Sequence, residues 1–365
     1  MLKREIVHKN RFMEPKQYLE ELLLTTAQQG ATDLHLSPGH YPTLRIDSRL
    51  IMLSQQKILD KETLEGLVFT LLGEERKARF LSEKELDFSY ELEGKNRFRV
   101  DAYQTKGGLA ASLRLIPNEV KTIDELNLPQ ITKIFSKLSQ GFVLVVGPNG
   151  HGKSTTLAAI VDMINKERTE KIVTIEDPIE YIFTPDKSII DQREVYQDTF
   201  SFHKALRSTF RQNVNVIMVG EMRDYETMSA VVTAAETGHL VLTSLHTNSA
   251  SQTIERIIDS FPPNQESQIR NQLANTISGI ISQRLIPRIK GGLIPAVEVM
   301  IATPAIRTLI RDNRPKQMDM VIETSQDVGM ISLDRSLADL VRRKEISWER
   351  AEFYSLNQAE LRNLL

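Results

Sequence analysis

A glycine-rich loop that ends in a lysine and a serine carries the clearest chemistry in the sequence. The stretch GPNGHGKSTT, residues 147–156, places Gly147, Gly152, Lys153 and Ser154 in the pattern G-x-x-x-x-G-K-[ST]. Glycines let backbone N–H groups curl around phosphates, and the amino terminus of a following helix adds its dipole. We therefore predict that the loop binds the phosphates of a nucleotide.

The residues of this loop have separate predicted roles. Lys153 is expected to reach the β- and γ-phosphate oxygens, and the Ser154 hydroxyl is expected to ligate Mg²⁺. ATP and Mg²⁺ are therefore the predicted cofactors. The candidate nucleotide contacts are Gly147, Pro148, Asn149, Gly150, His151, Gly152, Lys153, Ser154 and Thr155.

Polar residues follow three apolar stretches that are candidate strands. KIVTI runs into Glu176, with Glu180 close behind. VNVIMV runs into Gly220 and Glu221, and HLVLTS ends two residues before His246. Because ligands of an open parallel sheet bind beyond the carboxyl ends of its strands, these side chains are expected to meet at the edge that holds the phosphate loop.

The types of these side chains suggest hydrolysis. Glu221 is the predicted residue that orients and deprotonates the attacking water, because its strand is expected to lie beside the strand of the loop. Glu176 and Glu180 either hold Mg²⁺ through waters or position the nucleophile. His246 is expected to hydrogen-bond the γ-phosphate, although a single histidine near a strand end is more often a structural hydrogen bonder. The candidate metal residues are Ser154, Glu176 and Glu221.

Four apolar stretches must position this chemistry. They are FVLVV (142–146), KIVTI (171–175), VNVIMV (214–219) and HLVLTS (239–244), separated by segments long enough for crossover helices. This rhythm predicts an α/β fold with a mostly parallel sheet covered on both faces. Before it, Thr122 and Glu125 have capping-box spacing, and Pro129 suits the first turn of a helix.

The first third of the chain has a different pattern. EPKQYLEELLLTTAQQG predicts a helix that stops at Gly30, and ATDLHLS alternates as a strand does. Three further short strands, LDFSYEL, NRFRVDAYQ and LAASLRLI, are separated by glycine turns, which favours an antiparallel sheet. The predicted organisation is an amino-terminal domain at 1–117, a linker at 118–125 and a second domain at 126–365.

Composition excludes several classes of protein. The chain has 365 residues, 41% of them apolar, and it contains no cysteine, so neither a disulfide framework nor a thiolate zinc site is expected. The start, MLKREIVHKNRF, lacks the apolar segment of a signal peptide, and no run reaches the length of a membrane span. We therefore expect a cytoplasmic location. A net charge of -2 gives no reason to expect a nucleic-acid partner.

The motifs together resemble the secretion-ATPase superfamily of type II secretion and type IV pili. Its phosphate loop, aspartate box, Walker B segment and histidine box are similar to GPNGHGKSTT, IEDPIEY (175–181), VGEMRD (219–224) and TAAETGHLVLTSLHTNSA (233–250). ATDLHLSPGHYPTLRIDSRL (31–50), DQREV (191–195) and FHKALRS (202–208) also match. The resemblance implies a PAS-like first domain, a RecA-like second domain, and Glu221 as the catalytic carboxylate.

Within the superfamily the chain resembles the retraction, PilT-like branch. TPAIRTLIR (303–311) is similar to an element of retraction ATPases, although locally it is also an ordinary proline-started helix with Ile306, Leu309 and Ile310 inward. The resemblance implies a homohexamer at the cytoplasmic face of the inner membrane that drives pilus retraction in twitching motility. It also implies an inner-membrane platform protein and a second retraction ATPase as partners. Pro117 to Val120 is the expected hinge.

The resemblance further implies arginines that stabilise charge developing on the phosphates. The candidates are Arg99, Arg114, Arg193 and Arg207. The chain departs from the family at Asn213-Val214-Asn215, where Asp-Pro-Asp is usual, and at His151, where a small residue is usual. We expect retained, slow ATPase activity. The alternatives are an assembly or type II secretion ATPase, an accessory retraction ATPase, a non-catalytic ring component and a RecA-like nucleic-acid translocase.

Overall fold

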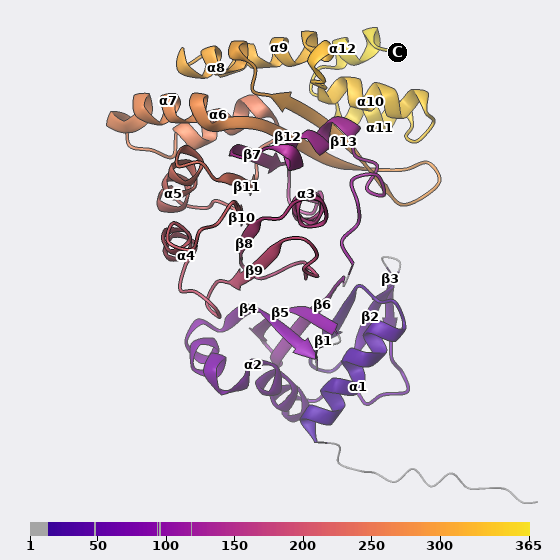
Figure 1. The fold of residues 1–365 in the computed structure, drawn as a ribbon. Coiled ribbons are helices and arrows are strands. Elements are labelled where there is room, and N and C mark those ends of the chain that lie inside the picture. The colour runs from indigo at the N-terminus through magenta and orange to yellow at the C-terminus, as the bar shows by residue number, and fades with distance from the viewer. Residues whose placement is uncertain (1–13, 47–48, 93, 95, 118) are drawn as a thin grey trace, which may run out of the picture. The chain divides into compact units, whose positions relative to one another are not determined.

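The computed structural model describes residues 14–46, 49–92, 94, 96–117 and 119–365 (Figure 1). The chain divides into two compact units, Met1–Asn118 and Glu119–Leu365. The first thirteen residues of the predicted first domain and residue 118 of the predicted linker and hinge lie outside the described residues. So do residues 47–48 of the ATDLHLSPGHYPTLRIDSRL motif.

The first unit contains a six-stranded sheet in the order β3-β2-β1-β6-β5-β4, and every neighbouring pair is antiparallel. This confirms the antiparallel character predicted for this part of the chain. Helix α2 and strands β2 and β3 are additions to the predicted elements. The elements are α1 (Pro15–Gln28), β1 (Asp33–Leu36), β2 (Thr43–Ile46), β3 (Arg49–Met52), α2 (Lys61–Glu83), β4 (Glu85–Leu92), β5 (Asn96–Thr105) and β6 (Gly108–Ile116).

Both helices of this unit pack on one face of its sheet (Figure 1). Leu19, Leu22 and Leu23 of α1 are fully buried, as the apolar spacing of the helix predicts. The helix ends at Gln28, and Gly30 two residues later has a left-handed backbone with φ +64°, which confirms the predicted stop.

The second unit contains a seven-stranded sheet in the order β13-β12-β7-β11-β10-β8-β9. All neighbouring pairs are parallel except β12 with β13, so the predicted mostly parallel sheet is confirmed. The four predicted strands are β7, β8, β10 and β11. The bounds are β7 (Gly141–Val146), β8 (Lys171–Glu176), β9 (Ile189–Glu194), β10 (Val216–Val219), β11 (Leu240–Leu245), β12 (Ile277–Pro287) and β13 (Leu293–Ile301).

Helices cover both faces of this sheet, which is why β7 is buried along its whole length (Figure 1). On one face, Val143 and Val145 pack with α3 (Lys153–Glu167). On the other face, alternate residues of β7 pack with helices α4, α5, α6 and α7. The bounds of these four are α4 (Phe202–Thr209), α5 (Tyr225–Glu236), α6 (Ala250–Ile258) and α7 (Glu266–Thr276).

The segment before β7 differs from its prediction in detail. Thr122 and Glu125 form the predicted reciprocal bonds, each backbone N–H donating to the other side chain, but they close a turn. The helix after Pro129 is the 3₁₀ helix η1 (Gln130–Lys137). Its Thr132 and Ser136 hydroxyls donate to carbonyls three residues earlier, which suits this tighter helix.

The chain ends in short helices beyond β13. Helix α8 has Pro304 in its first turn and buries Ile306 and Ile310, with Leu309 packed beside them, as predicted. The remaining bounds are α8 (Pro304–Arg311), α9 (Met318–Thr324), α10 (Leu333–Arg342), α11 (Trp348–Tyr354), α12 (Gln358–Asn363), η2 (Pro263–Gln265), η3 (Pro315–Gln317) and η4 (Gln326–Val328). In the described part of the chain no helix combines the length and apolar character needed to cross a membrane.

Candidate active site

The phosphate loop follows β7 directly, and its glycines are required by its shape. Gly147, Gly150 and Gly152 have φ of +146°, +75° and +79°. A Cβ on Gly147 would lie 2.3 Å from the Gln283 carbonyl oxygen, so no larger residue fits there. Helix α3 starts at Lys153, which places its free N–H groups at the end of the loop.

Lys153 is anchored inside its own loop. Its Nζ donates to the carbonyl oxygens of Gly147 and Pro148, both at 2.9 Å, and lies 3.2 Å from Nδ1 of His246. Burial lowers the pKa of Lys153, while Glu221 and Glu180 act against that shift. An ammonium group has three donors, so all three are engaged before any phosphate arrives.

His246 joins this lysine to Glu221. Its Nε2 lies 3.1 Å from Oε2 of Glu221, and its Nδ1 faces Lys153. A neutral imidazole with its hydrogen on Nε2 satisfies both contacts. The structure therefore brings together three of the predicted site residues, carried by α3, the end of β11 and the end of β10.

Glu221 lies at the same sheet edge as the phosphate loop, but the predicted order of the strands that lead to them is wrong. Strand β11 lies between β7 and β10, so the strand before Glu221 is not beside the strand of the loop. The register pairs β11 with both neighbours in parallel, and the three carboxyl ends share one edge. Glu221 therefore reaches the loop through His246 rather than directly.

Arg223 is a second partner of Glu221 and was not predicted as a site residue. It forms an ion pair with Glu221 and lies 3.8 Å from Oδ2 of Asp177. Burial raises the pKa of Glu221, but the hydrogen bonds from Arg223 and His246 outweigh it and hold the pKa below its usual range. Glu221 is therefore an ionised carboxylate at neutral pH. Arg223 stands two residues after Glu221 in VGEMRD, and this proximity is the sequence signal that could have identified it.

Glu176 lies at the end of β8 and is 6% exposed. Its Oε1 accepts from the Thr174 hydroxyl at 2.7 Å and from Nε2 of Gln192 at 3.5 Å, and its Oε2 accepts from the Glu180 N–H at 3.3 Å. Burial raises the pKa of Glu176 to about 7, although these hydrogen bonds oppose the shift. Both oxygens already have protein donors.

The residues at this edge of the sheet fit a Mg²⁺ ion that has only a few protein ligands. In the described residues no group of three or more His, Cys, Asp or Glu side chains is arranged to hold a metal ion. Mg²⁺ bound with a nucleotide needs only one or two protein oxygens besides phosphates and waters. The Ser154 hydroxyl, in the first turn of α3, is suited to direct contact, whereas the engaged oxygens of Glu176 suit contact through water.

Two further side chains tie the strand ends to the loop. Tyr181, in the aspartate-box segment, has its hydroxyl 2.8 Å from that of Thr155 on α3. The Ser244 hydroxyl of β11 donates to the Gly220 carbonyl at 2.6 Å, next to Glu221. Tyr181 stands in the quoted motif but its aromatic type alone gave no reason to assign it a role.

The substituted segment Asn213-Val214-Asn215 lies away from this edge. The Asn215 side chain accepts from the Lys171 N–H at 2.9 Å, at the start of β8 and just before β10. The strands are parallel, so this is the amino end of the sheet, whereas Glu221 is at the carboxyl end. The loss of two carboxylates therefore leaves the chemistry at the opposite edge in place.

The two predicted arginines of the second unit differ in their surroundings. Arg193 on β9 donates to the Ser208 hydroxyl at 2.8 Å and to the Asp198 carbonyl at 3.3 Å. Arg207 is exposed on α4. Neither contact of Arg193 is with the phosphate loop.

The predicted arginines of the first unit form a pair. Arg99 on β5 and Arg114 on β6 are directly opposite each other in the register. Arg99 donates to Asp87 through two nitrogens, at distances from 2.6 to 3.2 Å, and Nε of Arg114 donates to Asp33 at 2.9 Å. The two arginines therefore have different carboxylate partners, and Asp33 also lies 3.8 Å from Nε of Arg45.

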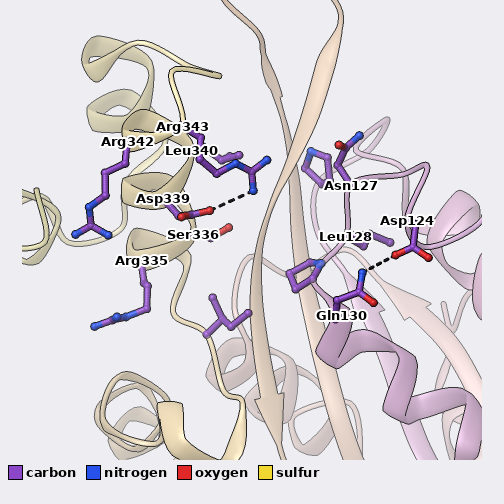
Figure 2. A pocket seen from close by; sticks show the side chains of 13 residues that line it. Asp124, Asn127, Leu128, Gln130, Arg335, Ser336, Asp339, Leu340, Arg342 and Arg343 are labelled. Carbon is purple, nitrogen blue, oxygen red and sulfur yellow. Dashed lines mark hydrogen bonds and ion pairs between the residues drawn. The ribbon is translucent and has the colours of Figure 1, made fainter.

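An apolar hollow of about 90 Å³ lies beside the phosphate loop. A wider cleft of about 570 Å³ shares Leu128 and Pro295 with it. Figure 2 shows Arg335, Arg342 and Arg343 on the α10 side of this cleft, and Asp124 and Gln130 on the opposite side. The hollow is lined by Leu126, Leu128, Gly152, Thr155, Thr156, Gln283, Leu285 and Pro295.

A family model matches most of this chain. The model described as "Type II/IV secretion system protein" covers residues 16–323, which include every loop of the site above. The chain belongs to this family. Four of the segments that suggested the resemblance, the phosphate loop, the aspartate box, the Walker B segment and the histidine box, contribute residues to this edge of the sheet.

Relatives within the family are similar along nearly their whole length. The "Type IV pilus retractation ATPase PilT" of Pseudomonas aeruginosa is 44% identical over 333 residues, covering 91% of this chain and 96% of the relative. The "Twitching motility protein" of Neisseria gonorrhoeae is 41% identical over 323 residues, covering 88% and 86%. A crystal structure titled as the pilus retraction motor PilT with bound ADP has a TM-score of 0.87 at 40% identity, covering 94% and 98%.

Proposed function

We propose that this protein is a Mg²⁺-dependent ATPase that hydrolyses ATP to ADP and phosphate and powers type IV pilus retraction. The observation that carries the proposal is the connected series Lys153, His246 and Glu221, beside a glycine loop at the carboxyl edge of a parallel sheet. Phosphoryl transfer depends mainly on positioning and on charge stabilisation, and this series supplies both.

In the proposed reaction, Nζ of Lys153 gives up its hydrogen bonds to the loop carbonyls and donates to phosphate oxygens instead. Its three present partners are uncharged, so a phosphate offers a stronger, charge-assisted hydrogen bond. His246 then loses its lysine donor and becomes free to face the terminal phosphate. Glu221, held ionised by Arg223 and His246, orients and deprotonates the attacking water.

Mg²⁺, when bound, would supply charge neutralisation between the β- and γ-phosphates. Ser154 is the proposed direct ligand. Glu176 and Glu180 are proposed to act through waters. Glu221, the remaining candidate metal residue, is proposed to activate water instead, because its two oxygens already have a cationic and an imidazole partner. The apolar hollow beside Gly152 is the proposed place for the base.

The retraction role is supported by the relatives, whose names include retraction and twitching motility. Helix α8, with the retraction-like TPAIRTLIR sequence, agrees with this choice. We further propose a homohexamer at the cytoplasmic face of the inner membrane that works on a platform protein of the pilus and has a second retraction ATPase as a partner. Movement about the 117–120 region is the proposed power stroke.

Arginines from a neighbouring subunit are proposed to complete the site. Arg99 and Arg114 are the candidates from the first unit, because their paired arrangement presents two guanidinium groups together. Arg193 and Arg207 are the candidates from the second. Head-to-tail contacts that close into a ring bring such residues to a neighbour's nucleotide.

The direct test is phosphate release from Mg-ATP by the purified full-length chain, beside Glu221→Ala. Activity in the wild type that is lost in the variant supports the proposal, and no release under any condition removes it. Deleting the gene separates the roles, because surplus pili that fail to retract support retraction, whereas absent pili support assembly. Stimulation by single-stranded DNA would favour a nucleic-acid translocase instead.

A further inference from the structure

Strand β12 continues past the end of its neighbour β7. The pairing of the two strands ends where Ser282 is opposite Val146. Strand β12 runs on to Pro287 and still pairs with β13 on its other side, with Leu285 opposite Pro295. On the side of β7, the backbone of Leu285 therefore faces the phosphate loop and not a strand.

The side chain of His151 occupies that position. Its Nδ1 accepts the Leu285 N–H at 2.9 Å, so the imidazole takes the place of a strand carbonyl. A buried backbone N–H without an acceptor is costly, which gives this contact a structural purpose. His151 was predicted as a nucleotide contact, but here its acceptor nitrogen is directed at β12.

A second residue of β12 reinforces the connection. Nε2 of Gln283 donates to the His151 carbonyl at 2.8 Å, and its Oε1 accepts from the Thr156 hydroxyl at 2.7 Å. The backbone of Gln283 also contacts Gly147 too closely for any Cβ. Strand β12 thus contacts the start of the loop at Gly147, the crest of the loop at His151 and the first turn of α3 at Thr156.

We propose that His151 is a positioning residue that fastens the crest of the phosphate loop to β12 and so holds the loop in its phosphate-binding shape before the nucleotide arrives. The proposal rests on the nucleotide site of the proposed function. A loop that is already ordered loses less conformational entropy when the phosphates bind, and this raises affinity.

The contact needs a neutral imidazole, because a protonated ring has no acceptor. Burial lowers the pKa of His151, and the nearby charges of Arg284 and Lys153 lower it further. These charged groups come from β12 and from α3, the two elements against which the ring lies. The acceptor is therefore available at neutral pH and is lost as the solution becomes acidic.

A matched pair of variants isolates the acceptor. His151→Asn places an oxygen at the same number of bonds from the backbone as Nδ1, and His151→Leu has a similar shape without an acceptor. In the nucleotide-free protein, amide hydrogen exchange at Leu285 should be about tenfold faster in the leucine variant than in the wild type, and close to wild type in the asparagine variant. Equal exchange in all three proteins would overturn the proposal.

Nucleotide binding gives the second measurement. The Kd values for ATP and ADP should rise about tenfold in the leucine variant and less than about threefold in the asparagine variant. Between pH 8 and pH 5.5, the affinity of the wild type should fall more than that of the asparagine variant, because only the wild type has an acceptor at this position that protonation removes. Unchanged affinity in the leucine variant would contradict the inference. If the wild type bound no nucleotide, the proposed function would be wrong. The hydrogen-exchange measurement at Leu285 would still test the proposed role of His151.

Discussion

Nε2 of His246 lies 3.1 Å from Oε2 of Glu221, and the other nitrogen of the same ring lies 3.2 Å from Nζ of Lys153. One side chain therefore contacts both the lysine proposed to hold phosphate and the glutamate proposed to activate water. Strand β11, which ends one residue before it, lies between the strands that lead to those two groups. We therefore expect the histidine to respond to the presence of the terminal phosphate.

Glu221→Gln should abolish most of the hydrolysis while leaving ATP binding intact. The amide cannot accept the proton of the attacking water, so kcat should fall by about 10²–10⁴-fold. Phosphate release and nucleotide titration on the same preparation measure the two effects. A variant with wild-type turnover would show that another base operates.

His246→Ala should lower kcat by about 10- to 100-fold with less than about a threefold change in the Kd for ATP. Its loss leaves Glu221 with Arg223 alone and removes the contact to Lys153. His246→Gln, which keeps a donor and an acceptor, should recover part of the rate. A larger effect on binding than on kcat would identify the histidine as a nucleotide anchor.

Glu176→Gln should change the dependence of stability on pH. Because burial raises the folded-state pKa to about 7, the folded chain keeps this proton to a higher pH than the unfolded chain. The associated stability is complete below the unfolded value of 4.5 and is lost as the pH rises through 7. The variant should therefore be more stable than the wild type at pH 8, by up to about 3 kcal/mol, and much less so at pH 5.

Denaturation curves of both proteins at pH 5 and pH 8 measure this difference, with Glu180→Gln as a control on a neighbouring carboxyl. Other buried carboxyls, such as Glu298 with its pKa of about 7, are common to all three proteins and cancel in the comparison. A constant difference between wild type and Glu176→Gln across this pH range would be inconsistent with a titrating Glu176.

Gly147→Ala should eliminate ATP binding, with a loss of more than about 30-fold in affinity. The added Cβ would lie 2.3 Å from the Gln283 carbonyl oxygen, so loop and β12 must separate. Gly150→Ala is the matched control, since it also has a positive φ but no atom within 4 Å of the added Cβ. Similar binding by the two variants would show that backbone strain, rather than the contact with β12, decides the outcome.

Arg99→Ala and Arg207→Ala should each lower kcat at least about tenfold while changing the Kd for ATP much less. An arginine on the developing charge acts mainly in the transition state. Arg79→Ala, on the exposed surface of α2, should have wild-type kinetics. Wild-type turnover in both test variants would remove these arginines from the mechanism.

The sequence predicted the parallel strands because each is a short apolar run buried on both faces. It did not predict their order, since pairing depends on contacts distant along the chain. The apolar run of β11 gives no sign that it lies between β7 and β10. The 3₁₀ form of η1 was also missed, because its apolar spacing is close to that of an α-helix.

The candidate site was predictable where chemistry follows a strand end, as for Glu221 and His246. It was not predictable where partners are distant: Gln283 and Thr156 are 127 residues apart and meet through a single hydrogen bond. Strands β12 and β13 carry no phosphate-binding motif, so nothing in their composition indicated that they form one side of the loop. His151 was predicted as a nucleotide contact, and its role as an acceptor could be found only from the position of Leu285.

Arg99 and Arg114 lie directly opposite each other, so the first unit must place an anion beside each guanidinium group. Side chains at directly paired positions lie about 5 Å apart at Cβ, so two guanidinium groups there repel each other unless anions accompany them. Asp87 and Asp33 fill that need in the isolated subunit. A polyphosphate approaching this face would offer greater negative charge, and we expect the long arginine side chains to turn toward it and leave the two carboxylates. The same two arginines would then respond both to nucleotide binding and to contact between subunits, without any rearrangement of the sheet that carries them.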